Sequence, residues 1–262
     1  MANPRRDDNL ALRIGMAIAQ REIRLASRRK LVRALFVTSL IPLVIFAIVL
    51  IAEVASKAAL GMSLGWDPVH QFLGVQSFPV MLLSMAIGAP MVALDRAEDV
   101  LFLYATRRVR PLDYALGKWA AVALPASLLL LLPGLLMAGM RWGILPDVDA
   151  VGSAWIAAKV VATSLLVGAG YGGVALAASA LTQRGRWALL LALGLLFGPE
   201  IGRGFARTEW PLGPMHASTT LIRALFGDGR SDYAVLGACL LAACAIAGVV
   251  LCATRVRKEM IP

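Results

Sequence analysis

Side chains that could perform bond-making chemistry are few and scattered in this sequence. Lys118 follows Gly117, a pair that ends phosphate-binding loops, but the preceding glycine loop and the following Ser or Thr are missing. His70 and His216 lie far apart, and no His-Glu-x-x-His zinc motif occurs. All three cysteines lie within residues 233–254, an apolar stretch in which they act as small apolar residues. We therefore expect no catalytic, cofactor-binding or metal-ligating residue on this chain.

Binding chemistry is better represented, in a charged segment spanning residues 95–118. Good helix formers with apolar side chains are preceded by acids and followed by bases, which suits a helix dipole, so we expect a short helix over Ala97–Ala105. Pro111 blocks its continuation. Such a helix either rests on the bilayer surface or docks a cytosolic partner. The candidate contact residues are Glu98, Asp99, Val100, Leu101, Tyr104, Arg107 and Arg108.

Long apolar stretches flank this segment and dominate the rest of the chain. Five stretches of about twenty residues carry no charge, and a sixth is uncharged from Trp187 to Pro199. A helix of that length crosses a hydrocarbon core about 30 Å thick. The sequence therefore predicts one all-α membrane domain of six spans over residues 1–262. The expected spans are 34–55, 72–94, 119–140, 156–182, 187–206 and 233–254.

The distribution of basic residues predicts the orientation of these spans. The net charge of +10 could suggest nucleic acid, but 19 of the 26 Lys and Arg residues fall in the two termini and the segments 95–118 and 183–186. An excess of Lys and Arg marks cytoplasmic segments. We therefore expect both termini in the cytoplasm, attraction to anionic membrane lipid, and no nucleic-acid partner.

Two flanking regions are expected to lie at the membrane surface or to dip into it. Residues 1–33 carry a moderately amphipathic pattern, with Ile14, Ile18 and Leu25 on one helical face, and predict an interfacial helix leading into the first span. The outer segment 207–232 is expected to hold a re-entrant or interfacial helix, His216–Phe226, capped by Gly227.

The fifth apolar stretch is interrupted by Gly198-Pro199 and Glu200. Either the helix continues to Ala206, which we prefer because it leaves Glu200 near the headgroups, or it breaks there and the chain re-enters. Gly194, Gly198 and Gly202 recur every fourth residue, a spacing that allows close helix contact, and we consider them a candidate subunit interface. For a similar stripe in the fourth span (Ser164, Gly168, Gly172, Ala175 and Ser179), we favour packing within the chain.

The segment 95–118 and its surroundings resemble the ABC-2 class of ATP-binding-cassette transporter permeases. The resemblance rests on Glu98 or Asp99, Leu101–Thr106, Arg108-Val109-Arg110-Pro111 and Leu116-Gly117-Lys118. It extends to the N-terminal amphipathic helix, the six spans and the long outer excursion before the last span. The Pro follows the basic residues instead of preceding them, and the family's Gly-Thr pair is absent.

This resemblance implies a permease subunit in a bacterial cytoplasmic membrane, paired with a second six-span subunit and a pair of cytosolic ATPase subunits. ATP and Mg²⁺ would be bound by that ATPase, and this chain would contribute no cofactor site. The helix in 95–118 would be the coupling helix that transmits ATPase closure. An uncharged interior suits a lipid-like, amphipathic or peptide cargo. A non-transporting assembly subunit and an ion-coupled secondary transporter remain open alternatives, although the latter usually needs ionisable residues near the midplane.

Overall fold

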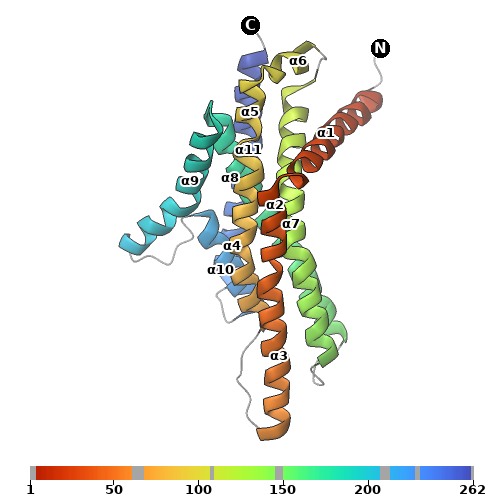
Figure 1. Ribbon diagram of the computed structural model, residues 1–262, viewed down its shortest axis with the longest axis vertical. Helices are drawn as coiled ribbons and strands as arrows, with labels where there is room; N and C mark the ends of the chain where they lie inside the picture. The colour runs from red at the N-terminus through yellow and green to blue at the C-terminus, as the bar shows by residue number, and fades with distance from the viewer. Residues whose placement is uncertain are drawn as a thin grey trace.

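A computed structural model describes residues 4–60, 68–106, 109–144, 150–206, 213–227 and 231–260. Within these ranges every regular element is an α-helix (Figure 1). The helices are α1 (Pro4–Ser27), α2 (Lys30–Thr38), α3 (Leu40–Leu60), α4 (Pro68–Gly88), α5 (Met91–Ala97), α6 (Val100–Thr106), α7 (Pro111–Ile144), α8 (Ala150–Leu181), α9 (Gly185–Ala206), α10 (Pro214–Phe226) and α11 (Ser231–Met260).

Six helical segments of the described chain are long and apolar enough to cross a membrane, which confirms the expected multi-pass, all-α class. They are Lys30–Lys57, Val69–Ala97, Pro111–Ile144, Ala150–Leu181, Gly185–Phe205 and Tyr233–Met260, and each overlaps an expected span. The chain begins and ends at the same end of the bundle, which also carries α5 and α6 (Figure 1). We call this the terminal end.

The long helices α7 and α8 form the centre of the bundle and pack against α4 and α11. About two thirds of the apolar windows of α4 and α8 are buried, compared with 17% for α9 and 11% for α2–α3. The last two are therefore peripheral spans, and α9 diverges from the bundle along its length (Figure 1).

Small residues explain how the central helices approach one another. A Cβ added at Gly172 would lie 3.2 Å from the backbone nitrogen of Ala123 on α7. One added at Gly173 or Gly248 would collide with backbone atoms across the α8–α11 contact. Membrane helices associate largely through such close packing, since lipid offers no hydrophobic drive. The small-residue stripe of the fourth span therefore packs within the chain, as expected.

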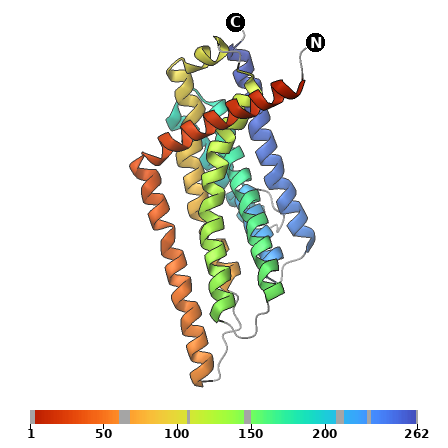
Figure 2. The same ribbon diagram turned by 90° about the vertical axis from the view of Figure 1, so that its right-hand side faces the viewer.

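Helix α1 lies across the terminal end and turns sharply into α2 at Arg28 and Arg29 (Figure 2). Ile18 and Ala19 are buried against the bundle, whereas Arg13 and Arg24 are exposed, so the helix is amphipathic as expected. Leu25 departs from that pattern because 43% of its surface remains exposed.

The stretch from Gly185 to Phe226 contains the two helices expected there. Helix α9 continues through Pro199 to Ala206, the preferred interpretation of the interrupted stretch. Helix α10 ends at the cap residue Gly227 and packs against α4, α8 and α11. The Tyr171 hydroxyl of α8 and the Ser218 Oγ of α10 are 2.7 Å apart, and both side chains are buried. α10 thus folds back onto the bundle.

Candidate functional site

The segment between α4 and α7 forms two short helices joined by a sharp turn. Helix α5 ends at Ala97, and Asp99 adopts a φ of 54°, in the left-handed region. Asp tolerates this conformation better than most residues, since its short side chain bonds locally. The helix expected over Ala97–Ala105 therefore begins at Val100, as α6, and the two acids lie in the turn before it.

The expected contact residues divide between the interior and the surface. Glu98 and Asp99 are exposed and Val100 is half-buried, but Leu101 is 5% exposed and packs with Tyr114 and other core side chains at the terminal end. The Tyr104 ring packs edge-on against Tyr114, with ring centroids 5.3 Å apart. Arg107 and Arg108 lie outside the described residues.

Phe102 is a large apolar side chain that α6 presents to the surface, with 71% of its area exposed. Sequence reasoning missed this residue because it assigned the face of Val100, Leu101 and Tyr104 to a partner, whereas Leu101 on that face packs into the core. An aromatic side chain held in this way is a typical anchor for a partner protein.

A buried ionic cluster lies behind α6. The Lys118 side chain of α7 is fully buried, and its Nζ lies 2.8 Å from Glu22 Oε1 of α1 and 2.7 Å from Asp95 Oδ2 of α5. The Tyr114 hydroxyl donates a hydrogen bond of 2.6 Å to the same Asp95 oxygen. A buried ammonium requires this pairing, because an isolated charge in such a place is strongly unfavourable. We call Glu22, Asp95, Tyr114 and Lys118 the ionic cluster.

Gly117 allows α1 to reach this cluster. A Cβ at position 117 would lie 2.8 Å from the Gly15 carbonyl oxygen and 3.0 Å from the Ile18 Cβ, so a larger residue would push α1 away from α7. Gly117 and Lys118 thus act as a pair. The glycine permits the close crossing of α1, and the lysine pairs with the acid that α1 brings.

Helix α5 is anchored to the rest of the bundle at both ends. The Ser179 hydroxyl of α8 accepts hydrogen bonds from the backbone N–H groups of Val92 (2.9 Å) and Ala93 (3.2 Å), so α8 caps the start of α5. At the other end, Arg96 Nη1 donates to the Thr182 carbonyl oxygen (2.9 Å), and its Nε lies 2.8 Å from Glu259 Oε2 of α11.

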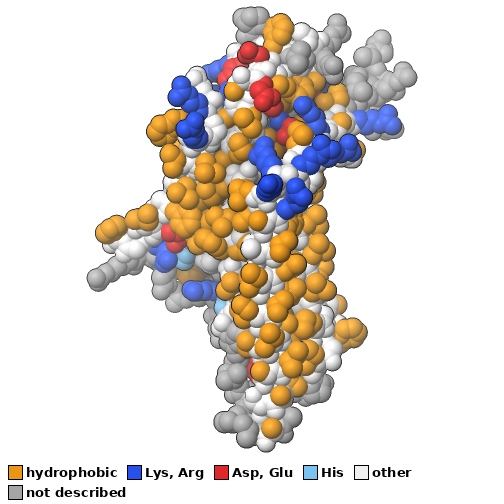
Figure 3. Space-filling model, viewed as in Figure 1, with side chains coloured by type: hydrophobic (Ala, Val, Ile, Leu, Met, Phe, Trp, Pro, Cys, Tyr) orange, Lys and Arg blue, Asp and Glu red, His pale blue; other side chains and the backbone are white. Residues whose placement is uncertain are grey.

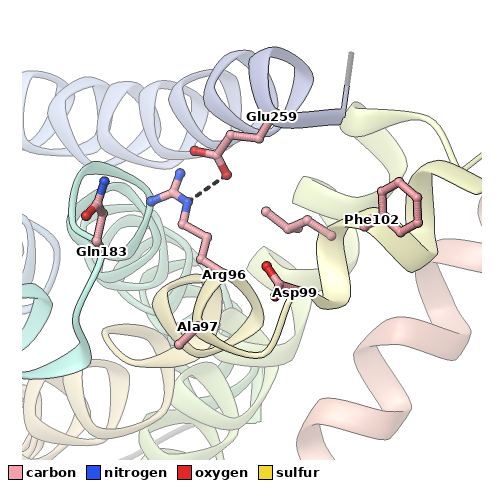
Figure 4. A pocket seen from close by; sticks show the side chains of 7 residues that line it. Arg96, Ala97, Asp99, Phe102, Gln183 and Glu259 are labelled. Carbon is pink, nitrogen blue, oxygen red and sulfur yellow. Dashed lines mark hydrogen bonds and ion pairs between the residues drawn. The ribbon is translucent and has the colours of Figure 1, made fainter. Parts of the chain in front are cut away.

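An open cleft of about 530 Å³ lies beside α6, and its lining includes Arg96 of α5, Gln183 after α8 and Glu259 of α11. Figure 4 shows Arg96 reaching across it toward Glu259, with Asp99 at the base of α6 and Gln183 on the opposite wall. Helix α6 therefore projects as a ledge. One side of the ledge is packed on the bundle, and the other borders this cleft.

These contacts connect α1, α5, α7, α8 and α11 at one place. Lys118 carried a signal in the sequence, as part of Leu116-Gly117-Lys118, but its partner Glu22 is 96 residues away and no local pattern relates the two. Across the described residues, no group of three His, Cys, Asp or Glu side chains could hold a metal ion.

One sequence motif typical of catalytic sites occurs outside the described residues. Residues 61–65 read Gly-Met-Ser-Leu-Gly, the spacing of a hydrolase nucleophile turn. That turn follows a β-strand, and the described parts of the chain contain no strand. The residues directly before the pattern belong to helix α3, which ends at Leu60.

Gly194, Gly198 and Gly202 lie on the open face of α9. All three are exposed, and a Cβ at any of them would have no atom within 4 Å in the described structure. The opposite face of α9, formed by Ala188, Ala192 and Leu196, packs against the bundle. The glycines are thus available to a neighbouring helix.

The fold and this site define a multi-pass, all-α membrane protein with an interhelical ionic cluster at its terminal end. No protein-family model matches the sequence, and no curated protein matches it significantly.

Proposed function

We propose that this chain is the membrane-spanning permease subunit of an ATP-driven exporter of the ABC-2 class. The observation that carries the proposal is the braced ledge α6, whose exposed Phe102 is backed by a buried core and by the ionic cluster. A surface helix that merely rests on lipid has no need of such bracing. A helix that receives a mechanical push does.

In the proposed mechanism a cytosolic ATPase pair binds α6, with Phe102 as the apolar anchor and Glu98 and Asp99 orienting it at the edge. Val100, Leu101 and Tyr104 hold the ledge against the bundle. Closure of the ATPase pair would move α5 and α6 together. Through Asp95 and Lys118 the motion would reach α7, and through Glu22 it would reach α1.

The orientation in this proposal places the terminal end in the cytoplasm of a bacterial inner membrane. Lys and Arg side chains gather at that end over α1, α2 and the turn before α9, above a broad apolar surface (Figure 3). That distribution follows the rule that positive residues remain on the cytoplasmic side.

A second six-span subunit completes the proposed pathway, since one bundle supplies one wall. The open faces of α3 and α9 support this part of the proposal. Both helices contact α4, both are peripheral, and α9 carries the glycine face Gly194–Gly198–Gly202. The cargo that we propose is lipid-like, amphipathic or a peptide.

The direct test places a photo-cross-linking amino acid at position 102 and, as a matched control, at the exposed lipid-facing position 132. Irradiation of native membranes should attach position 102, and not position 132, to a protein with a phosphate-binding loop. That protein's ATPase activity should then change when the two are reconstituted together. Labelling of both positions by lipid alone would exclude the docking role and leave an assembly subunit or an ion-coupled transporter.

A further inference from the structure

An apolar groove of about 590 Å³ lies in the angle where α1 turns into α2. Its walls come from α1, α2 and α7, and Ile87 of α4 contributes to its floor. Phe36 and Val37 form one side, and Leu124 and Leu128 form the other. All four keep a third or more of their surface exposed. Figure 2 shows this angle beneath α1, beside α7.

The mouth of this groove is strongly basic. Arg33 lines it, and Arg28, Arg29 and Lys30 occupy the turn directly above. The Arg33 Nη2 donates to the Arg28 carbonyl oxygen (3.0 Å), and the Arg29 Nη1 donates to the Ala86 carbonyl oxygen of α4 (3.3 Å). A guanidinium has five N–H donors, so one such bond leaves donors for a phosphate.

Nearby acids do not offset this charge. Glu22 is the acidic residue of the second half of α1, and its carboxylate is paired with Lys118 in the ionic cluster. The elbow therefore combines an apolar slot with a net positive rim. Figure 3 shows the blue side chains gathered at this elbow, directly above the apolar surface of α2 and α3.

We propose that this groove binds one anionic phospholipid of the bilayer, with an acyl chain in the slot and the phosphate on Arg28 and Arg33. The size of the slot lies within the range of roughly 300–1,000 Å³ that is usual for small-ligand sites. An amphipathic helix joined to a span places its basic face at headgroup depth, where an anionic lipid meets it.

Charge opposes the main competing occupant, a second copy of the chain packed two-fold about this groove. In a two-fold contact the same patch meets itself, so the basic elbow would face an identical basic elbow. The proposal concerns a bound lipid at the rim of the bundle, and it stands whether or not the chain is a permease.

The test is native mass spectrometry of the full chain in detergent, with palmitoyl-oleoyl phosphatidylglycerol or phosphatidylcholine added. The wild-type chain should retain one phosphatidylglycerol with an affinity about tenfold higher than for phosphatidylcholine. Arg28→Gln with Arg33→Gln should abolish that preference. Arg13→Gln, about four helical turns from Arg28 along α1, should keep it.

A second pair of variants tests the slot itself. Leu128→Trp fills the groove and should lower retention of both lipids, whereas Leu136→Trp, two turns further along the same exposed face of α7, should not. Val37→Trp fills the groove from the other wall. It replaces Leu128→Trp as the test variant if Leu128→Trp lowers the melting temperature of the protein. Equal affinity for the two lipids in the wild type would overturn the proposal. So would identical binding by the two α7 variants, or loss of a dimer in Leu128→Trp with lipid binding unchanged.

Discussion

The Lys118 ammonium and the Glu22 carboxylate, 96 residues apart in sequence, meet 2.8 Å apart at the crossing of α7 and α1. This contact ties the helix that lies across the terminal end to the longest span of the bundle. With Asp95 as the third member, it also ties both to the α5–α6 segment.

Replacing Lys118 by Met should therefore destabilise the protein strongly. Two carboxylates, Glu22 and Asp95, would then remain buried without a cation, at a cost of about 3–5 kcal/mol. We expect the apparent melting temperature in detergent to fall by roughly 10 °C. Lys258→Met, at an exposed position of α11, should have little effect. Adding Glu22→Gln and Asp95→Asn should restore part of the loss, and no restoration would mean that Lys118 acts through packing alone.

The crossing of α1 over α7 should depend on the absence of a side chain at position 117. Gly117→Ala places a methyl group 2.8 Å from the Gly15 carbonyl oxygen, which should cost about 1–3 kcal/mol and loosen α1. Limited proteolysis between α1 and α2 should then become faster. Gly139→Ala on the same helix meets nothing within 4 Å and should be neutral or stabilising. Equal proteolysis rates for the two variants would contradict the close crossing.

Phe102 and Leu101 should respond differently to the same substitution. Phe102→Asp removes an exposed side chain, so we expect normal folding but loss of ATPase binding and of ATP-driven transport. Leu101→Asp buries a charge in the core of the terminal end and should lower thermal stability first. Arg107→Ala should weaken coupling far less, since surface charge pairs contribute little. Binding that survives Phe102→Asp would leave α6 without a docking role.

The glycine face of α9 should be required for association of the two subunits in the proposed assembly. Gly198→Leu introduces a bulky side chain where a neighbouring helix would pack, so the subunit assembly should dissociate. Gly204 is also exposed without neighbours but lies about 120° around α9 from Gly198, which makes Gly204→Leu the matched control. Mass measured by light scattering after subtraction of detergent should separate the two variants. An assembly unaffected by Gly198→Leu would place the interface elsewhere.

Membrane orientation can be checked by labelling single cysteines in a chain lacking Cys239, Cys244 and Cys252. Cysteines at exposed positions 186 and 258 should react with impermeant reagents from the cytoplasmic side, because the terminal end carries most of the basic residues. Cysteines at positions 67, 147 and 228, which lie outside the described residues, should react from the outer side. The reverse pattern would invert the orientation.

The spans could be predicted because an uncharged stretch of twenty residues has few alternatives in a membrane. Helices α9 and α10 could also be predicted from local sequence, and Gly227 ends α10 where expected. The site was less predictable. Asp99 enters the left-handed region, so α6 begins at Val100 and not at Ala97. The sequence also did not show which face of this helix packs on the bundle, where Leu101 is buried and Phe102 exposed. The partners of Lys118 could not be predicted, because an ion pair between distant segments produces no recognisable spacing in the sequence.

Helix length has a consequence for the way this bundle responds to its lipid surroundings. Helix α7 has 34 residues and α8 has 32, about 50 Å of helix each. Both are longer than the hydrocarbon core is thick, so both still span the core when its thickness changes. Helix α9 has 22 residues, about 33 Å, which nearly equals the hydrocarbon core and leaves no reserve. Hydrophobic mismatch in a thicker or thinner bilayer therefore acts first on α9, the span that diverges from the bundle and bears the glycine face.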